Sequence, residues 1–264
     1  MPARQRKSPA ANPESEWFGF RRVRPEDKTG MVQEVFASVA SNYDVMNDLM
    51  SGGLHRLWKD HLVGLMRPKP GQTILDVAGG TGDIALRCWK RAKSQADIIV
   101  CDLNPAMLEQ GRAKAVDQGI LGGDVSMPTI RWITGNAEEL PIPSRSVDTY
   151  SIAFGLRNVT RIDKALAEAA RVLKPGGRFF CMEFSSGVMP ALKPFYENYC
   201  LHILPWLGEH VAKDRDAYQY LAESILRFPV QAELAKRMEK AALTQTKWLN
   251  LTGGIAVIHS GWKI

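Results

Sequence analysis

The stretch Thr73 to Leu86, TILDVAGGTGDIAL, decides the fold expected for this chain. It opens with a short apolar run that is typical of a strand buried on both faces: Ile74, Leu75, Val77 and Ala78. Three glycines and the start of a helical pattern follow. A strand, a glycine turn and a helix in this order build the ligand-binding crevice of an α/β sheet, where glycine lets a ligand approach the backbone. Because GTGDIA also matches the dinucleotide pattern G-x-G-x-x-A, the stretch alone leaves the ligand open.

The composition is ordinary for a globular protein, with 264 residues, 45% hydrophobic and 23% charged. This length suits one large α/β domain. The net charge of +6 permits contact with an anionic partner, although a scattered positive excess is also typical of an ordinary soluble surface. The four cysteines show no metal-ligand spacing, and no run approaches the roughly 18 apolar residues of a membrane span. Without a secretory signal, we expect a soluble or peripheral protein with no bound metal, in a reducing compartment.

The chain divides into a tail and one domain. Residues 1–28 are polar and basic, which predicts a disordered tail. Residues 29–264 predict a single domain. Within it, residues 31–67 predict a helical front cap, because apolar residues recur there at helical spacing. The long aromatic insertion of residues 190–229 predicts a second cap over the site.

Between and after these caps, strands and helices alternate, which predicts a Rossmann-like, doubly wound α/β sheet of seven strands. The expected strands are residues 73–78, 98–101, 129–134, 147–153, 178–184, 244–251 and 255–260. Thr252-Gly253-Gly254 joins the last two and is a hairpin signal. An antiparallel hairpin that closes a parallel sheet favours a methyltransferase topology over that of a dehydrogenase.

Polar residues follow the second and third expected strands. Asp102 lies 20 residues after Gly82, where a carboxylate can accept both hydroxyls of a ribose in either an NAD or an S-adenosylmethionine enzyme. Asp102 could instead cap the helix that begins at Pro105. Asn136 and Ala137 follow the third strand, where a side-chain amide can meet an adenine edge, although asparagine is also common in turns. These positions predict an adenosine-containing ligand.

The series LDVAGGTGD, CDLNPAML, GNAEELPIP and VLKPGGRFF resembles the motifs of class I S-adenosylmethionine-dependent methyltransferases. The segments NYDVMND, FGLRNV, DAYQYLAESI and NLTGGIAVIHSGWKI are similar to a narrower family, the C-methyltransferases of ubiquinone and menaquinone biosynthesis. This resemblance runs from about Phe18 to Ile264. Its most specific parts are NYDVMND and FGLRNV, which the wider superfamily lacks.

The resemblance implies S-adenosylmethionine as the cofactor, held by Thr81, Asp102, Asn136 and Ala137, with Gly80 and Gly82 making room for it. The chain departs from the family at Ala153, where a serine is frequent, so a serine contact cannot be carried over. The implied substrate is a polyprenyl quinol, either 2-methoxy-6-polyprenyl-1,4-benzoquinol or demethylmenaquinol. An aromatic carbon is a poor nucleophile unless its ring bears an oxyanion, so such a site needs a base and groups that stabilise a phenolate.

Three residues are the catalytic candidates: Tyr43, Arg157 and Asn158. Arg157 stays protonated, so it would stabilise the phenolate or orient a water, unless it forms a structural ion pair with Asp44 or Asp48. Tyr43 could hydrogen-bond the ring oxygen. The histidines His55, His202 and His210 are possible bases by pKa range, but a lone histidine beside tryptophan or proline is more often a packing residue, so none of the three is a catalytic candidate.

Two other classes compete with this hypothesis, a nicotinamide oxidoreductase and a non-catalytic cofactor-binding subunit. No base-methylation motif or basic–aromatic stripe indicates nucleic acid as a partner. A polyprenyl substrate predicts peripheral membrane contact, for which Arg21, Arg22 and Arg24 are candidates. We therefore expect a cytoplasmic protein at the inner face of the bacterial membrane, or one on the matrix side of the mitochondrial inner membrane. The resemblance also allows a homodimer or a quinone-biosynthesis complex.

Overall fold

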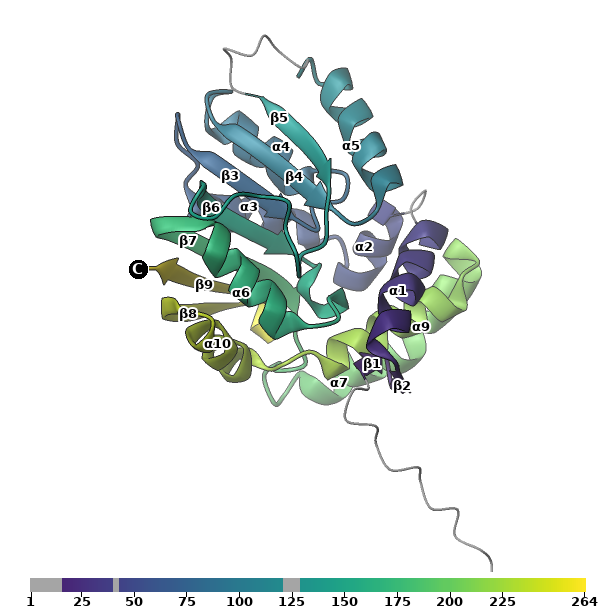
Figure 1. Cartoon of the computed structure of the whole chain (residues 1–264). Coiled ribbons are helices and arrows are strands. Elements are labelled where there is room, and N and C mark those ends of the chain that lie inside the picture. The colour runs from purple at the N-terminus through teal and green to yellow at the C-terminus, as the bar shows by residue number, and fades with distance from the viewer. Residues whose placement is uncertain (1–15, 40–42, 121–128) are drawn as a thin grey trace, which may run out of the picture.

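The structure is a computed structural model that describes residues 16–39, 43–120 and 129–264. Its centre is a seven-stranded sheet with the order β5-β4-β3-β6-β7-β9-β8 (Figure 1). The strands are β3 (Thr73–Val77), β4 (Asp97–Asp102), β5 (Ile130–Thr134), β6 (Val147–Ala153), β7 (Leu173–Phe184), β8 (Leu243–Leu251) and β9 (Ala256–Lys263). Strands β3 to β7 pair in parallel, while β9 pairs antiparallel with both β7 and β8. The predicted fold and its closing hairpin are confirmed.

Helices cover both faces of the sheet. The helices along the sheet are α3 (His55–Met66), α4 (Asp83–Arg91), α5 (Pro105–Asp117), α6 (Ile162–Val172) and α10 (Gln231–Lys240). Side chains of α3, α4 and α5 join one buried apolar cluster, and those of α6 and α10 join another. Successive strand residues alternate between the clusters, with Ile74 in the first and Leu75 in the second. A strand with both faces buried therefore appears in the sequence as a continuous apolar run.

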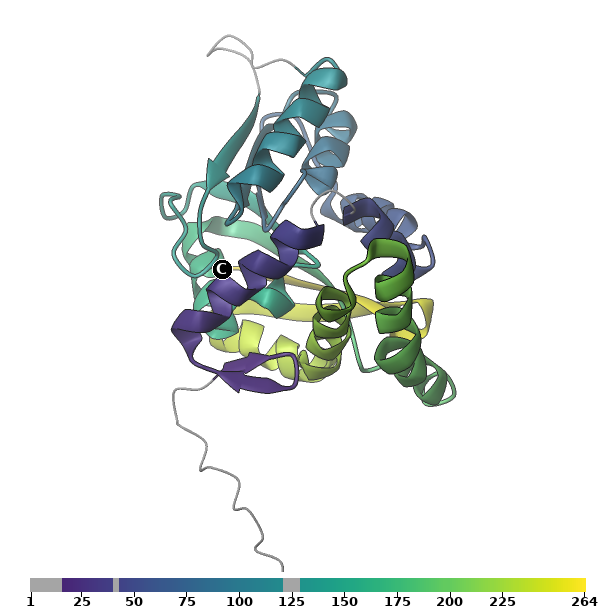
Figure 2. The same cartoon turned by 90° about the vertical axis from the view of Figure 1, so that its right-hand side faces the viewer.

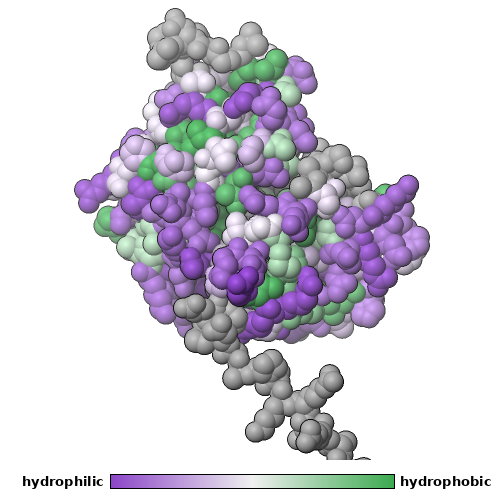
Figure 3. Space-filling model, turned by 45° about the vertical axis from the view of Figure 1, so that its right-hand side comes forward, coloured by the Kyte–Doolittle hydropathy of each residue, from purple (hydrophilic) through white to green (hydrophobic). Residues whose placement is uncertain are grey.

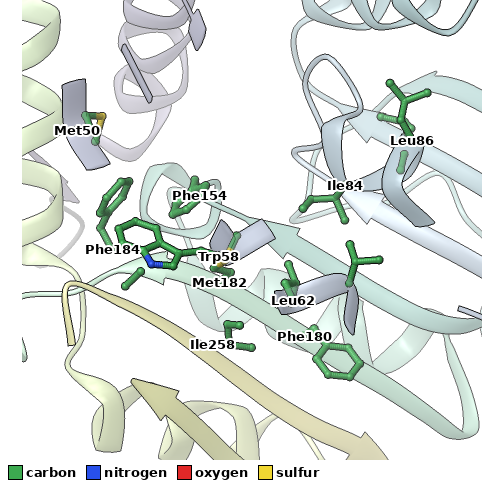
Figure 4. Close-up of a cluster of buried hydrophobic side chains, with 14 of the residues drawn as sticks. Met50, Trp58, Leu62, Ile84, Leu86, Phe154, Phe180, Met182, Phe184 and Ile258 are labelled. Atoms are coloured by element: carbon green, nitrogen blue, oxygen red, sulfur yellow. The ribbon is translucent and has the colours of Figure 1, made fainter. Parts of the chain in front are cut away.

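The larger apolar cluster ties the front of the chain to the sheet (Figure 4). Trp58 of α3 meets Phe184 at the end of β7 edge-on, with ring centroids 5.9 Å apart, and Phe154 lies 4.8 Å from Phe184. The indole N–H of Trp58 also donates to Thr252 in the turn between β8 and β9 (3.0 Å). Burying such a side chain stabilises the fold by about 1.5–3 kcal/mol, so this contact holds α3 against the sheet.

The remaining elements gather at the carboxyl ends of the parallel strands (Figures 1 and 2). They are β1 (Glu16–Phe18), β2 (Arg21–Val23), α1 (Pro25–Val39), α2 (Tyr43–Ser51), α7 (Lys193–Asn198), α8 (Leu204–Leu207) and α9 (Arg215–Arg227), with π-helical turns at Tyr199–Ile203 and Gly208–Ala212. No helix in the described residues is long and apolar enough to cross a membrane.

Residues 16–28 differ from the expected disordered tail, because they form the β1–β2 hairpin and the start of α1. The ring of Trp17 lies between the guanidinium groups of Arg22 and Arg227, at 4.0 and 3.8 Å from its centroid. Phe18 stacks on Tyr220 of α9 with ring centroids 4.1 Å apart. These cation–π and aromatic contacts order a segment whose polar composition predicts disorder. The rest of the expected tail, residues 1–15, lies outside the described residues.

A buried histidine makes stability depend on pH. His259 on β9 is 2% exposed, its Nε2 bonds the carbonyl of Gln231, and burial lowers its pKa to about 4. Since the unfolded chain takes up this proton at a higher pH, stability falls as pH drops from about 6.5 to 4, by up to about 3 kcal/mol. Urea unfolding measured between pH 7.5 and 4 should show a smaller fall in the free energy of unfolding for His259→Asn than for the wild type. Equal losses in both proteins would contradict this assignment.

Candidate active site

A cavity lies at the carboxyl ends of β3, β4, β5 and β6, with about 840 Å³ of empty space, part of it open to solvent. Its floor comes from the loops after these strands, including Gly80, Asp102, Asn136 and Ala137. Helix α1 lines the opposite side with Thr29, Val32, Gln33 and Phe36. Figure 3 shows apolar residues gathered in a band through the middle of an otherwise hydrophilic face. Parallel strands place their carboxyl ends at one edge, so residues far apart in sequence meet in this crevice.

The carboxylate of Asp102 is held by backbone donors. Its Oδ2 accepts from the N–H of Gly80 (2.8 Å), and its Oδ1 accepts from the N–H of Asn104 (2.8 Å). Burial raises the pKa of Asp102, and these backbone hydrogen bonds oppose that rise. The helix that begins at Pro105 is capped by Asn104, whose Oδ1 accepts from Ala106 (2.9 Å), and not by Asp102. Asp102 therefore presents an oriented acceptor to the cavity.

Asn136 and Ala137 form another part of the cavity wall, after β5. The Oδ1 of Asn136 accepts from the N–H of Glu138 (2.9 Å), which sets the plane of the amide. Ala137 is 8% exposed and offers a small apolar surface beside it. A flat ring seated here would meet an amide edge and an apolar wall, which suits an adenine.

Three residues of the glycine turn after β3 lie in three different surroundings. Gly80 has a φ of +52° and lines the cavity. Gly82 has a φ of +76°, and a Cβ there would come within 2.4 Å of the Trp132 ring, so its missing side chain accommodates Trp132. Thr81 is buried, bonds Lys114 through its hydroxyl (3.4 Å), and lines a smaller neighbouring cavity. The structure thus brings Gly80 to the main cavity, Thr81 to the smaller one, and Gly82 to neither.

Arg157 and Asn158 follow β6 in a short 3₁₀ turn, η2 (Leu156–Asn158). Asn158 lines the main cavity, donates to the carbonyl of Phe154 (3.4 Å) and accepts from the hydroxyl of Tyr220 (3.1 Å). Arg157 lines a neighbouring groove instead of the main cavity. Its guanidinium donates to Glu183 (2.8 Å) and to the carbonyl of Phe154 (2.6 Å). The pair is buried, with side chains 2% and 1% exposed.

Glu183 is the residue that sequence reasoning missed. It stands inside the apolar strand FFCMEF, and a lone carboxylate in such a strand is a signal for a buried partner. Burial raises the pKa of Glu183, and the charge of Arg157 opposes that rise. The ion-pair alternative had named Asp44 or Asp48. Asp48 instead bonds Arg56 (2.6 Å) and His55 (2.9 Å), and the side chain of Asp44 lies outside the described atoms.

Tyr43 begins α2, but its side chain lies outside the described atoms, so its role stays a prediction. His55, a possible base by sequence, is 2% exposed and bonded to Asp48, and burial lowers its pKa. His202 and His210 lie on the insertion, and His210 bonds the carbonyl of Trp206 (2.9 Å).

The cavity also fits the cofactor that the sequence indicates. Its floor offers a carboxylate for a ribose and an amide for an adenine. Beside the glycine turn, Asp76 is 1% exposed and its Oδ2 is a buried acceptor without a hydrogen-bond partner among the described residues. Such an acceptor suits the cationic end of an amino acid. Fold and site together define an S-adenosylmethionine-dependent methyltransferase.

Comparison with known proteins agrees with this class. Residues 23–263 match the ubiE/COQ5 methyltransferase family. The chain is 48% identical to the ubiquinone/menaquinone biosynthesis C-methyltransferase UbiE of Brucella anthropi, covering 94% of this chain and 92% of that protein. It is 50% identical to the UbiE of Dinoroseobacter shibae, covering 94% and 96%. The chain therefore belongs to the ubiE/COQ5 methyltransferase family.

Solved structures support the fold alone. A possible histamine N-methyltransferase from Thermotoga maritima superposes with a TM-score of 0.61 at 19% identity, covering 88% of this chain and all of that one. A putative methyltransferase in complex with the Trm112 activator of Haloferax volcanii gives 0.59 at 20% identity, covering 87% and 97%. At such identities the shared sheet says nothing of the substrate.

Proposed function

We propose that this chain methylates a ring carbon of a polyprenyl quinol in ubiquinone and/or menaquinone biosynthesis. The substrate would be 2-methoxy-6-polyprenyl-1,4-benzoquinol, demethylmenaquinol or both. Family membership and the names of relatives at 48–50% identity support this reaction. The structural observation that supports it is the η2 turn, in which Asn158 lines the main cavity and the adjacent Arg157 lines a neighbouring groove.

The chemistry sets what the chain must do. Bound S-adenosylmethionine supplies an electrophilic methyl group. The protein has to hold a quinol ring beside it, stabilise the ring as a phenolate and exclude water. Helix α1 supports the last task, because it covers the cavity with Val32 and Phe36.

Arg157 and Asn158 are the proposed phenolate-stabilising groups. Both recorded bonds of the guanidinium come from its Nη1, to Glu183 and to the carbonyl of Phe154, and within the described residues its buried Nε has no hydrogen-bond partner, so the Nε–H is left as a donor. The amide of Asn158 is oriented by Tyr220 and Phe154. In this proposal Arg157 supplies positive charge and Asn158 positions the ring oxygen. Tyr43 is the third proposed contact, at the start of α2.

Quinone profiling by mass spectrometry tests the reaction. A strain that lacks this activity should accumulate a demethylated quinone precursor, and the wild-type gene should clear it. A gene carrying Asn158→Ala should leave most of the precursor, provided that the variant melts within a few degrees of the wild type. If the wild-type protein binds S-adenosylmethionine but leaves the precursor in place, the proposed substrate is wrong.

We also propose that the protein works at a membrane surface, because its substrate partitions into lipid. The insertion exposes large apolar side chains, including Phe195 (76%) and Trp206 (55%). The β1–β2 hairpin adds Arg21 and Arg22, whose side chains are exposed. Exposed aromatic and basic side chains together suit an interface with anionic lipid.

Vesicle sedimentation measures this contact. With phosphatidylcholine–phosphatidylglycerol vesicles at low salt, Phe195→Ser/Trp206→Ser should weaken binding at least about tenfold, since each large side chain contributes about 1.5 kcal/mol or more when buried. Val116→Ser, which changes a 50% exposed residue of α5 on another part of the surface, is the matched control. Equal binding by the wild type and the double variant would show that these side chains of the insertion do not contact the membrane.

We also propose that the protein associates with a second copy of itself or with a partner in a complex. Strand β8 is at the edge of the sheet and exposes Trp248 (46%) and Leu249 (41%). An exposed apolar edge strand is a surface on which another chain can pair. Light scattering of the wild type and of Trp248→Lys would show whether a second copy uses it.

A further inference from the structure

The insertion carries a buried tyrosine whose hydroxyl group forms no hydrogen bond. Tyr196 lies on α7 and is 8% exposed, and its hydroxyl oxygen is a buried atom without a hydrogen-bond partner in the described part of the chain. Its polar neighbour is Cys200, whose thiol is only a weak acceptor. Burying a hydroxyl costs free energy when the bond to water is lost and no other replaces it. A buried oxygen of this kind therefore needs an explanation.

Packing alone does not require this oxygen. Tyr196 belongs to the larger apolar cluster, together with Phe154 and Phe184, whose rings lie side by side with centroids 4.8 Å apart (Figure 4). A phenylalanine ring would pack in this cluster without the cost of burying an unpaired hydroxyl. Tyr199, on the same segment, does use its hydroxyl, which donates to the carbonyl of Leu49 on α2. The hydroxyl of Tyr196 has no such structural bond.

Tyr196 lies near the groups proposed to hold the quinol. Burial and Cys200 raise the pKa of Tyr196, and the positive charge of Arg157 opposes that rise, so the two side chains are within electrostatic range. The guanidinium carbon of Arg157 lies 5.7 Å from the centroid of the Phe184 ring. Phe184 in turn packs on Phe154, which lines the main cavity. The surroundings of Tyr196 are thus continuous with the part of the main cavity where Phe154 is exposed to a ligand.

The polar groups in this region are arranged as hydrogen-bond donors. The Nε–H of Arg157 and the hydroxyl of Tyr196 both lack an acceptor among the described residues. Asn158 accepts from the hydroxyl of Tyr220 through its Oδ1, which leaves its amide nitrogen as the donor, with only a long bond to the carbonyl of Phe154 (3.4 Å). A ligand oxygen that carries negative charge suits such a set of donors. The phenolate form of a quinol has an oxygen of this kind.

We propose that the hydroxyl of Tyr196 donates a hydrogen bond to the reacting ring oxygen of the quinol, as a further phenolate-stabilising group beside Arg157 and Asn158. This inference rests on the proposed function, since it takes a quinol as the substrate. Tyr196 acts as a donor and not as a base, because its burial keeps the hydroxyl protonated. The insertion then contributes a residue that touches the substrate.

Tyr196→Phe tests this role, because it removes the hydroxyl and keeps the ring. With the quinol that the wild type methylates, kcat/KM for methyl transfer should fall about 10–100-fold, as expected for loss of a donor to a charged transition state. The affinity for S-adenosylhomocysteine, measured by calorimetry, should stay within about twofold of the wild type. The melting temperature should stay the same or rise, because the variant no longer buries an unpaired oxygen.

The pH profile separates a substrate contact from a packing effect. A donor that stabilises the phenolate lowers the pKa of the bound quinol, so Tyr196→Phe should raise that pKa and shift the rise of the rate with pH upward by about one unit. The titratable neighbours of Tyr196 are Tyr199 and Cys200, and burial raises the pKa of Tyr199 and raises that of Cys200 to about 11. Arg157 stays protonated, and its partner Glu183 is unchanged in the variant. The shift therefore reports the quinol.

Tyr218→Phe is the matched control. Tyr218 on α9 is also buried and its hydroxyl also lacks a partner within the described residues, but its charged neighbour is Asp214. This variant should keep the wild-type pH profile and a rate within about twofold. An unchanged rate in Tyr196→Phe, a lower rate without the pH shift, or an equal loss in Tyr218→Phe would overturn the proposal and leave the proposed reaction standing. If the wild type methylates neither quinol, the proposed function is wrong, and this inference with it.

Discussion

Replacement of Arg157 by methionine is expected to lower the free energy of unfolding by about 3–5 kcal/mol, because it leaves the buried carboxylate of Glu183 without its partner. Glu183 is 1% exposed, and it accepts from the guanidinium (2.8 Å) and from the backbone N–H groups of Arg157 and Phe184 (3.2 Å each). Without the guanidinium the carboxyl must either stay charged in an apolar strand or take up a proton. Urea unfolding measures the loss, and a methyl-transfer assay should show activity falling below detection.

Two further variants separate stability from catalysis. Arg112→Met removes an exposed ion pair with Glu109 (3.0 Å) and should change stability by less than about 1 kcal/mol. Arg157→Met/Glu183→Leu removes both buried charges, so it should recover most of the lost stability but none of the activity. If the double variant methylates quinol at the wild-type rate, Arg157 has only a structural role. If Arg157→Met unfolds like the wild type, the ion pair contributes little.

Asp102→Asn is expected to weaken S-adenosylmethionine binding about 100-fold, since hydrogen bonds to a charged acceptor are roughly twice as strong as neutral ones. The amide would keep the shape of the side chain, but its nitrogen would face a backbone donor or a ribose hydroxyl. The Gly80 and Asn104 N–H groups that hold the carboxylate would then lose part of their own pairing. Calorimetry measures the affinity, and thermal unfolding without ligand measures the structural part.

Asp97→Asn is the control for this prediction. Asp97 is the first residue of the same strand, β4, at the end opposite to Asp102 and the cavity, and its side chain is exposed. We expect the affinity of Asp97→Asn for S-adenosylmethionine to stay within about twofold of that of the wild type. Binding of NADH in place of S-adenosylmethionine by the wild-type protein would instead revive the oxidoreductase alternative.

The sheet could be predicted because its signals are local. The apolar run before Gly79 is buried on both faces in β3, and Thr252-Gly253-Gly254 does join two antiparallel strands. Two positions that line the main cavity could also be named, since Asp102 and Asn136 follow strands whose carboxyl ends meet at one edge of a parallel sheet. Such inferences need only periodicity, turn residues and the rule for parallel strands.

The partners of the buried charges could not be predicted. Arg157 and Glu183 meet because β6 and β7 are neighbours in a given register, with Ala153 opposite Met182. Trp17 and Arg227 lie at opposite ends of the chain, and their contact orders a hairpin that composition alone assigns to a disordered tail. In the sequence, Lys59 is one charge among several on an amphipathic helix. Only the packing of α3 beside the glycine turn brings Lys59 next to Asp76 and Asp83.

The sequence by itself determined the α/β class, the closing hairpin, the cofactor and the family, because glycines, strand-end polar residues and long motifs act over a few neighbouring positions. Only the tertiary structure decided which charges are buried together and which cavity each loop residue reaches. The reason for this division is desolvation. Burying a charge costs so much free energy that the charge needs a partner of opposite sign, and packing across the sheet brings that partner close whatever its distance along the chain.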